Sequence, residues 1–154
     1  MIETEQSVTI DAPIGDVWEH VRDIERWARL MPGMREFELI DANESRWTLK
    51  VGVGGLVRTV KVLVLVEEWA GPGRVTFRYS LEGDPVEGCG FYHAAALDAH
   101  STEITLHVEV RGSGKLAPMW EAMGRPLLPR FARSFAGELK ADIEAGRGAM
   151  AAAG

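Results

Sequence analysis

The side chains best suited to chemistry are a histidine and a tyrosine on neighbouring predicted strands. His93 lies in an apolar segment over residues 88–97, and Tyr79 lies in an alternating segment over residues 74–81. Imidazole titrates near neutral pH, and a buried phenol needs a hydrogen-bond partner. Together they could hold a substrate carbonyl and assist enolisation by proton transfer, which makes them the catalytic candidates. The alternative is a hydrogen bond within the core.

Metal ligands and nucleophiles are sparse. The histidines, His20, His93, His100 and His107, are widely spaced, and Cys89 is the single cysteine. Metal sites need closely spaced or paired ligands, and an internal disulfide needs a second cysteine. We therefore expect no metal and no cofactor, and we interpret Cys89 as a small buried residue. By alternation His107 lies on the polar side of its predicted strand.

The composition is that of one soluble domain. The chain has 154 residues, with 17 Lys and Arg against 23 Asp and Glu, a net charge of −6. An acidic chain of this length argues against nucleic-acid binding, which needs a basic surface. The longest strongly apolar run, residues 62–66, is too short to cross a bilayer, and the start of the chain is acidic and polar. We expect a cytoplasmic protein without stable membrane insertion.

Apolar spacing predicts the elements of the first two thirds. A period of two over residues 3–10 predicts a strand, and Asp11 and Asp23 are predicted to cap two short helices, the second of which ends at Pro32-Gly33. Alternation then predicts six further strands, with a hairpin turn at Gly54-Gly55. These strands cover residues 36–40, 46–53, 57–66, 74–81, 88–97 and 104–111.

The last third changes to a helical period. Its apolar residues recur at steps of three and four. They are Leu116, Trp120, Met123, Leu127, Phe131, Phe135, Leu139 and Ile143. Because proline disrupts helix interiors, Pro126 and Pro129 predict an irregular first part and a firm helix from about Pro129. We expect one domain over residues 1–145 and a flexible Gly/Ala tail over 146–154.

This order of elements predicts an α+β fold with a cavity. Consecutive strands pair as an antiparallel sheet, and one long helix cannot cover a curved sheet without leaving space. In the strand over residues 88–97 we take Cys89, Phe91 and His93 to face that space. The predicted ligand-binding residues are Trp27, Met31, Trp47, Phe77, Tyr79, Phe91, His93, Trp120, Met123, Leu127 and Phe131.

Several segments resemble a known superfamily. They are Ile10-Asp11-Ala12-Pro13, Asp23-Ile24-Glu25-Arg26-Trp27, Met31-Pro32-Gly33-Met34, Thr102-Glu103-Ile104-Thr105 and Gly114-Lys115-Leu116-Ala117-Pro118. Over residues 3–145 the chain resembles the START-like, SRPBCC helix-grip superfamily, in its polyketide cyclase/dehydrase-type branch. It also resembles a second family, the G-type subunits of carbon-monoxide dehydrogenase. The resemblance implies a helix-grip fold with an apolar cavity, and it does not imply one reaction.

Three functions remain open from the sequence. The first is binding of a small apolar or aromatic molecule, lipid-like or polyketide-like, between sheet and helix. The second is a polyketide aromatase/cyclase or dehydratase that acts through Tyr79 and His93. The third is an assembly or regulatory protein whose cavity is filled by its own side chains. The sequence leaves both a monomer and a dimer open.

Overall fold

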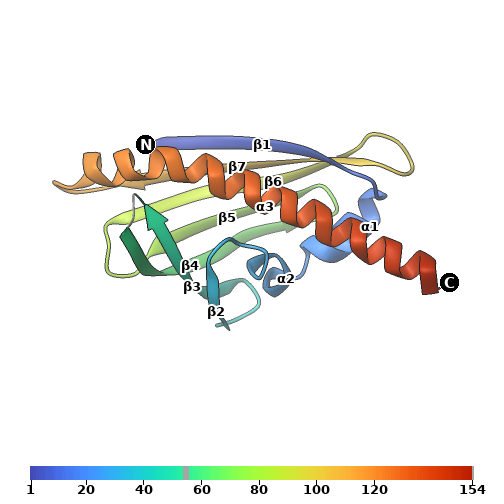
Figure 1. Ribbon diagram of the computed structural model, residues 1–154, viewed down its shortest axis with the longest axis horizontal. Coiled ribbons are helices and arrows are strands. Elements are labelled where there is room, and N and C mark those ends of the chain that lie inside the picture. Colours follow the sequence, from blue (N-terminus) through green and yellow to red (C-terminus); the bar gives the residue numbers. More distant parts are fainter. Residues whose placement is uncertain (54–55, 154) are drawn as a thin grey trace.

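The computed structural model is one curved antiparallel sheet with a long helix laid across it (Figure 1). It describes the backbone of residues 1–53 and 56–153 and the side chains of residues 1–52 and 57–146. The elements in chain order are β1 (Ile2–Ile10), α1 (Ile14–Val21), α2 (Ile24–Ala28), β2 (Met34–Leu39), β3 (Glu44–Val53), β4 (Leu56–Ala70), β5 (Arg74–Leu81), β6 (Val86–Ala96), β7 (Thr102–Gly112) and α3 (Ala117–Ala153).

The sheet has seven strands in the order β1-β7-β6-β5-β4-β3-β2. Strands β2 to β7 form a meander of neighbours, and β1 joins its open end by pairing with β7, so that Ile2 lies opposite Val110 and Ile10 opposite Thr102. The predicted α+β helix-grip architecture is confirmed. The turn predicted at Gly54-Gly55 lies outside the described residues, although Val53 and Leu56 pair on either side of it.

Alternation along the strands supplies the core. Ile10 on β1, Val75 on β5 and Ile104 on β7 are buried, while the residues between them point to the outer face. Side chains on a strand alternate between the two faces of a sheet, so a period of two places every second residue against α3. The concave face is therefore apolar along most of the sheet.

The two short helices lie at one end of the sheet and differ in how they begin. Asp23 caps α2 as predicted, because its carboxylate accepts a hydrogen bond from the Glu25 backbone N–H at 3.2 Å. The predicted cap at Asp11 was wrong: α1 begins after Pro13, and no side chain caps it. Proline fits this position because the first helical turn needs no donor from it. Helix α2 brings Trp27 into the core.

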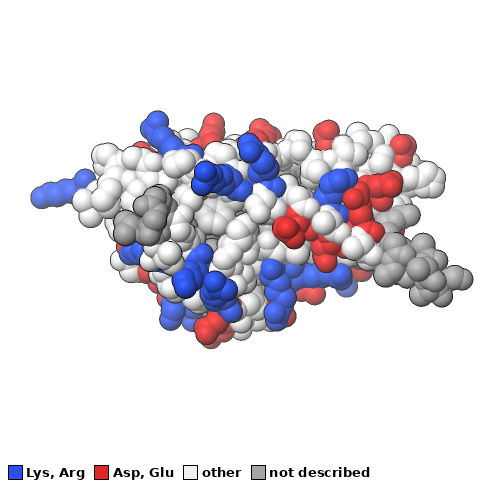
Figure 2. Space-filling model, in the orientation of Figure 1, with Lys and Arg blue, Asp and Glu red and all other residues white. Residues whose placement is uncertain are grey.

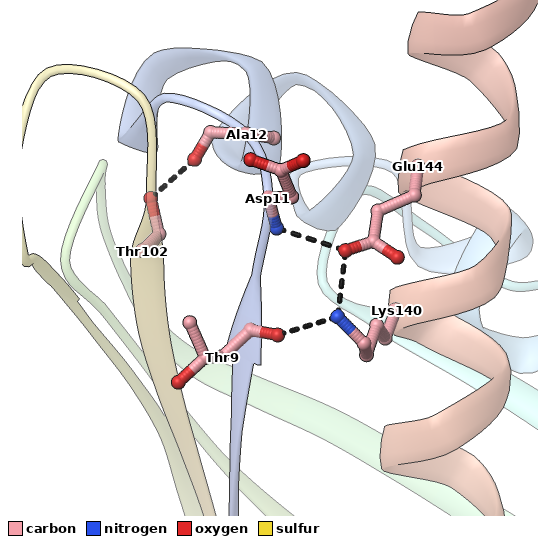
Figure 3. A network of polar contacts seen from close by, with 6 residues as sticks. All are labelled: Thr9, Asp11, Ala12, Thr102, Lys140 and Glu144. Carbon is pink, nitrogen blue, oxygen red and sulfur yellow. Dashed lines mark hydrogen bonds and ion pairs between the residues drawn. The ribbon is translucent and has the colours of Figure 1, made fainter.

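Polar contacts attach the C-terminal half of α3 to the end of β1 (Figure 3). Lys140 Nζ donates to the Thr9 carbonyl at 2.7 Å and pairs with Glu144 at 2.6 Å. Glu144 Oε1 also accepts the backbone N–H of Asp11 at 2.9 Å. Phe135, Leu139 and Ile143 are buried in the same half of the helix, so this half is held by both packing and charge.

Helix α3 starts earlier than the prolines predicted. It is continuous from Ala117, with Pro126 and Pro129 inside it. Proline removes one backbone donor and disfavours the preceding turn, but a long helix whose other half is anchored can include that defect. The predicted tail also begins as helix, and its side chains from residue 147 onward lie outside the described part of the chain. Among the described residues no helix is both long and apolar enough to cross a bilayer.

Candidate ligand cavity

A cavity of about 600 Å³ lies between the concave face of the sheet and the N-terminal half of α3. Its walls are almost entirely carbon. The sheet contributes Trp47, Val51, Val57, Val60, Val62, Val64, Phe77, Tyr79, Leu81, Val86, Leu106, Val108 and Val110, and α3 contributes Met119, Trp120, Met123, Gly124, Leu127, Leu128, Phe131, Ala132 and Phe135. Cavities of roughly 300–1,000 Å³ with apolar walls are typical of small-molecule sites.

An aromatic cluster around Trp27 forms the inner wall of the cavity. The Trp27 ring lies 5.9 Å from Trp47, 6.1 Å from Phe77 and 6.1 Å from Phe135, in edge or tilted geometry. Such offset contacts are more favourable than face-to-face stacking. Trp47 is fixed in turn because its indole N–H donates to the buried Ser45 hydroxyl at 2.8 Å. The inner wall is therefore rigid and aromatic.

The outer part of the cavity reaches the surface. Val57 at the start of β4 is 64% exposed and Met119 at the start of α3 is 45% exposed, yet both line the cavity. Met31 and Met123 also line it. Methionine side chains are flexible and polarisable, so they adapt to ligands of irregular shape. This end of the cavity is both open and adaptable.

Arg58 is the charged side chain among the described lining residues. Its guanidinium donates to both carboxylate oxygens of Asp84, each at 2.8 Å, and lies 5.0 Å from the centre of the Trp120 ring. Figure 2 shows further Lys and Arg side chains along the N-terminal half of α3, while acidic side chains gather toward its C-terminal half. Arg125, Arg130 and Arg133 account for basic charge in the first of these halves.

Tyr79 lines the cavity, but its hydroxyl is already committed. The phenol donates to the Glu109 backbone carbonyl at 2.6 Å. Burial, reinforced by the charges of Cys89 and Glu109, raises the pKa of Tyr79 well above its usual value. The phenol therefore stays protonated at neutral pH and acts as a structural donor. The core hydrogen bond, which was the alternative to a catalytic role, is the one observed.

The predicted facing of β6 was wrong. Val86, Tyr92 and Ala94 are buried, whereas His93 is exposed, so Cys89, Phe91 and His93 face away from the cavity. The physical reason is a pair of glycines. Gly88 lies opposite Tyr79 and Gly90 opposite Phe77. A side chain at either glycine would collide with the aromatic ring opposite, and two glycines gave no apolar signal for the inward face.

The outward residues of β6 have other partners. Phe91 stacks on His107, with ring centres 5.0 Å apart and planes at 15°. The Cys89 thiol donates to Glu109 Oε2 at 3.0 Å, and this hydrogen bond, with burial, raises the pKa of the thiol. Cys89 is half-buried on the outer face and not part of the core. The proposed pairing of Tyr79 with His93 is therefore overturned.

The other predicted site residues lie together at the cavity. These are Trp27, Met31, Trp47, Phe77, Tyr79, Trp120, Met123, Leu127 and Phe131. Leu106, Val108 and Val110 on β7 also line the cavity but were not predicted to, because their visible alternation assigned them only to the core. Arg58 and Met119 were missed as well, since the sequence gives no local signal for them.

Comparison with known proteins places the chain in a family. The family model described as "Polyketide cyclase / dehydrase and lipid transport" matches residues 1–144. The chain belongs to this family. Membership in the polyketide cyclase/dehydrase and lipid transport family agrees with the START-like, SRPBCC resemblance of the sequence. A search of curated proteins finds no match.

Solved structures with the same fold have low sequence identity to this chain. A conserved protein from Geobacillus kaustophilus has a TM-score of 0.80 at 17% identity, covering 93% of this chain and 95% of its own. The Zhui aromatase/cyclase from a Streptomyces species has a TM-score of 0.65 at 21% identity, covering 93% of each chain. A START superfamily protein from Mycobacterium smegmatis has a TM-score of 0.67 at 14% identity, covering 92% of this chain and 97% of its own. At these identities the likeness shows the fold.

Proposed function

We propose that this member of the family binds a small apolar or aromatic molecule, lipid-like or polyketide-like, in the cavity between the sheet and α3. The observation that carries the proposal is a space of about 600 Å³ with carbon walls and an end that reaches the surface. Burying apolar ligand surface is favourable by roughly 25 cal/mol per Å², part of which offsets the cost of association.

The chemistry of the walls favours binding over acid–base catalysis. The described lining residues include no histidine, cysteine, aspartate or glutamate. The remaining candidate, the Tyr79 hydroxyl, donates to a backbone carbonyl. A cyclase or dehydratase that uses positioned acid and base groups would need titratable side chains at the reacting atoms. The filled-cavity alternative conflicts with the volume of the space.

Ligand selection would come from shape and from a few polar points. The aromatic cluster at Trp27 would hold the apolar end of the molecule, and the methionines at the open end would adjust to its length. Arg58, at the cavity wall, would lie near a polar group of the ligand. Its bond to Asp84 and its contact with Trp120 hold the guanidinium in place before any ligand arrives, which lowers the ordering cost of binding.

The test fills the cavity and measures binding of a defined probe. Met123 lies on the helix wall of the cavity, so Met123→Trp adds bulk to the space. We expect this variant to bind the neutral fluorophore N-phenyl-1-naphthylamine at least tenfold more weakly than the wild type, with an unchanged circular dichroism spectrum. Leu97→Trp is the matched control, because Leu97 is 55% exposed and does not line the cavity. Equal affinity of Met123→Trp and wild type would overturn the proposal.

A second measurement addresses the natural ligand. Native mass spectrometry of the purified wild-type protein is expected to show a population with a bound small molecule that organic extraction removes. The same preparation of Met123→Trp is expected to lack that population. A bound molecule retained by Met123→Trp would place the binding site elsewhere.

A further inference from the structure

The outer face of the sheet, opposite the cavity, gathers four side chains that can bind metals. Glu3 on β1 pairs in register with Glu109 on β7, and Glu109 pairs with Cys89 on β6. His107 precedes Glu109 by two residues and so lies on the same face. The cavity-lining residues Leu106, Val108 and Val110 alternate with them on the other face.

The ligand atoms of three of these residues lie close together. His107 Nε2 is 3.8 Å from Glu3 Oε2 and 4.0 Å from Glu109 Oε1, and one ligand atom from each residue lies within 4.8 Å of the others. Bonds of about 2.1 Å in tetrahedral geometry place neighbouring ligand atoms roughly 3.4 Å apart. Small side-chain rotations, chiefly of the exposed Glu3, would bring the three atoms to that spacing.

Two neighbours orient the group. The His107 ring stacks on Phe91, which fixes the plane of the imidazole. The Cys89 thiol donates to Glu109 Oε2, while Oε1 of the same carboxylate is the oxygen near His107. Hydrogen bonds of this kind to a ligating carboxylate fix its orientation in metal sites. His107 and Glu109 side chains are 19% and 28% exposed and Glu3 is 58% exposed, so the group is partly enclosed with one open side.

The negative charge of the group has no basic partner in the described part of the chain. Among the described residues neither Glu3 nor Glu109 forms an ion pair with a lysine or arginine side chain. Two carboxylates beside one imidazole attract a divalent cation, and a donor set of one nitrogen and two oxygens suits Zn²⁺. Three protein ligands would leave a fourth position for water.

We propose that Glu3, His107 and Glu109 form a Zn²⁺ site that joins the edge strand β1 to β7. The site is separate from the cavity and does not depend on its ligand. Because β1 lies at the edge of the sheet, a cation shared between β1 and β7 would stabilise the folded chain in proportion to its occupancy.

The test is titration of EDTA-treated protein with ZnCl₂, followed by calorimetry and thermal unfolding. All proteins carry Cys89→Ser, which keeps a donor to Glu109 and removes zinc binding by a free thiol. We expect one Zn²⁺ per chain and a midpoint of unfolding that rises with ZnCl₂. His107→Gln and the Glu3→Gln, Glu109→Gln pair are expected to weaken binding at least tenfold and to remove the rise in midpoint.

Matched controls and a second readout separate this site from adventitious binding. His100→Ala and Glu103→Gln change a histidine in the β6–β7 turn and an exposed acid on β7, and both are expected to bind Zn²⁺ as the parent does. Circular dichroism without metal reports whether each variant folds. With Co²⁺ as the probe, visible d–d bands are expected in the parent and not in His107→Gln. No zinc binding by the parent, or undiminished binding by folded His107→Gln, would overturn the proposal.

Discussion

Gly88 and Gly90 show how single residues set the shape of the cavity wall. A Cβ at Gly88 would lie 2.2 Å from the Glu109 carbonyl oxygen and 2.3 Å from the Tyr79 ring. The absence of a side chain lets the Tyr79 ring lie across β6 and reach the Glu109 carbonyl. The tyrosine hydroxyl and the glycine opposite it therefore form one structural unit.

This unit leads to a prediction about stability. Gly88→Ala is expected to lower the free energy of unfolding by about 3 kcal/mol, because the new methyl group meets backbone as well as a ring. Gly137→Ala is the matched control, since Gly137 lies on α3 with no atom within 4 Å of its added Cβ. It is expected to stabilise the protein by roughly 1 kcal/mol. Urea unfolding of both variants checks the prediction, and a stable Gly88→Ala would contradict it.

The same residues mark the limit of sequence-based prediction at this scale. Alternation correctly placed Phe77 and Tyr79 on the inward face of β5. It failed on β6, where the inward positions hold Gly88 and Gly90 and the larger side chains, Phe91 and His93, point outward. A glycine has no hydropathic signal, so its facing depends on the strand beside it. Only the register between β5 and β6 supplies that information.

At the scale of elements, α3 has two halves with different support. Phe135, Leu139 and Ile143 are buried and the Lys140–Glu144 pair bonds to β1. The half before Phe131 lies over the cavity. The apolar spacing of α3 was readable from the sequence, but continuity through Pro126 and Pro129 was not, because local proline rules ignore the anchoring of the following turns.

The anchor of α3 predicts a pH dependence. The Lys140 hydrogen bond, followed by the Asp11 backbone N–H, lowers the pKa of Glu144 below its ordinary value of 4.5. A carboxylate with a lowered folded-state pKa stabilises the fold above its unfolded pKa and loses that contribution as the pH falls through the folded value. Glu144→Gln is expected to be less stable than wild type at pH 7, and the difference is expected to shrink below about pH 4.5.

Urea unfolding at pH 7 and pH 3.5 measures this difference. Glu138→Gln serves as the control because Glu138 is an exposed acid on the same helix. Its stability relative to wild type is expected to change little between the two pH values. An equal loss of stability for Glu144→Gln at both pH values would contradict the assignment of charge to the anchor.

The proline pair predicts a link between helix stability and ligand exchange. Pro126 and Pro129 cannot donate to the carbonyls one turn earlier, so the segment over the cavity lacks two helical hydrogen bonds. Pro126→Ala with Pro129→Ala is expected to raise the midpoint of thermal unfolding, since each proline costs up to about 3 kcal/mol in a helix interior. The same variant is expected to release N-phenyl-1-naphthylamine several-fold more slowly in stopped-flow measurements. Faster release from a stabilised variant would contradict this role.

At the scale of the whole molecule, the cavity follows from the number and order of elements. Seven strands form one curved sheet, and one helix covers its concave face at two different separations. At the C-terminal half of α3 apolar side chains interlock with the sheet, and at the other half they line a space of about 600 Å³. The sequence predicted this arrangement because element order and apolar period suffice for it. The size of the space depends on side-chain packing that no local pattern encodes.

This division of α3 predicts two rates of backbone hydrogen exchange. Local opening is easiest where few apolar contacts are lost. Without ligand, amides of residues 119–131 are expected to exchange at least tenfold faster than those of residues 135–146, where Phe135, Leu139 and Ile143 are buried. Saturating N-phenyl-1-naphthylamine is expected to slow exchange in the first segment and to leave the second nearly unchanged, because the probe contacts only the walls of the cavity. Hydrogen exchange with mass spectrometry resolves the two segments, and uniform protection along α3 would mean that the helix responds as one unit.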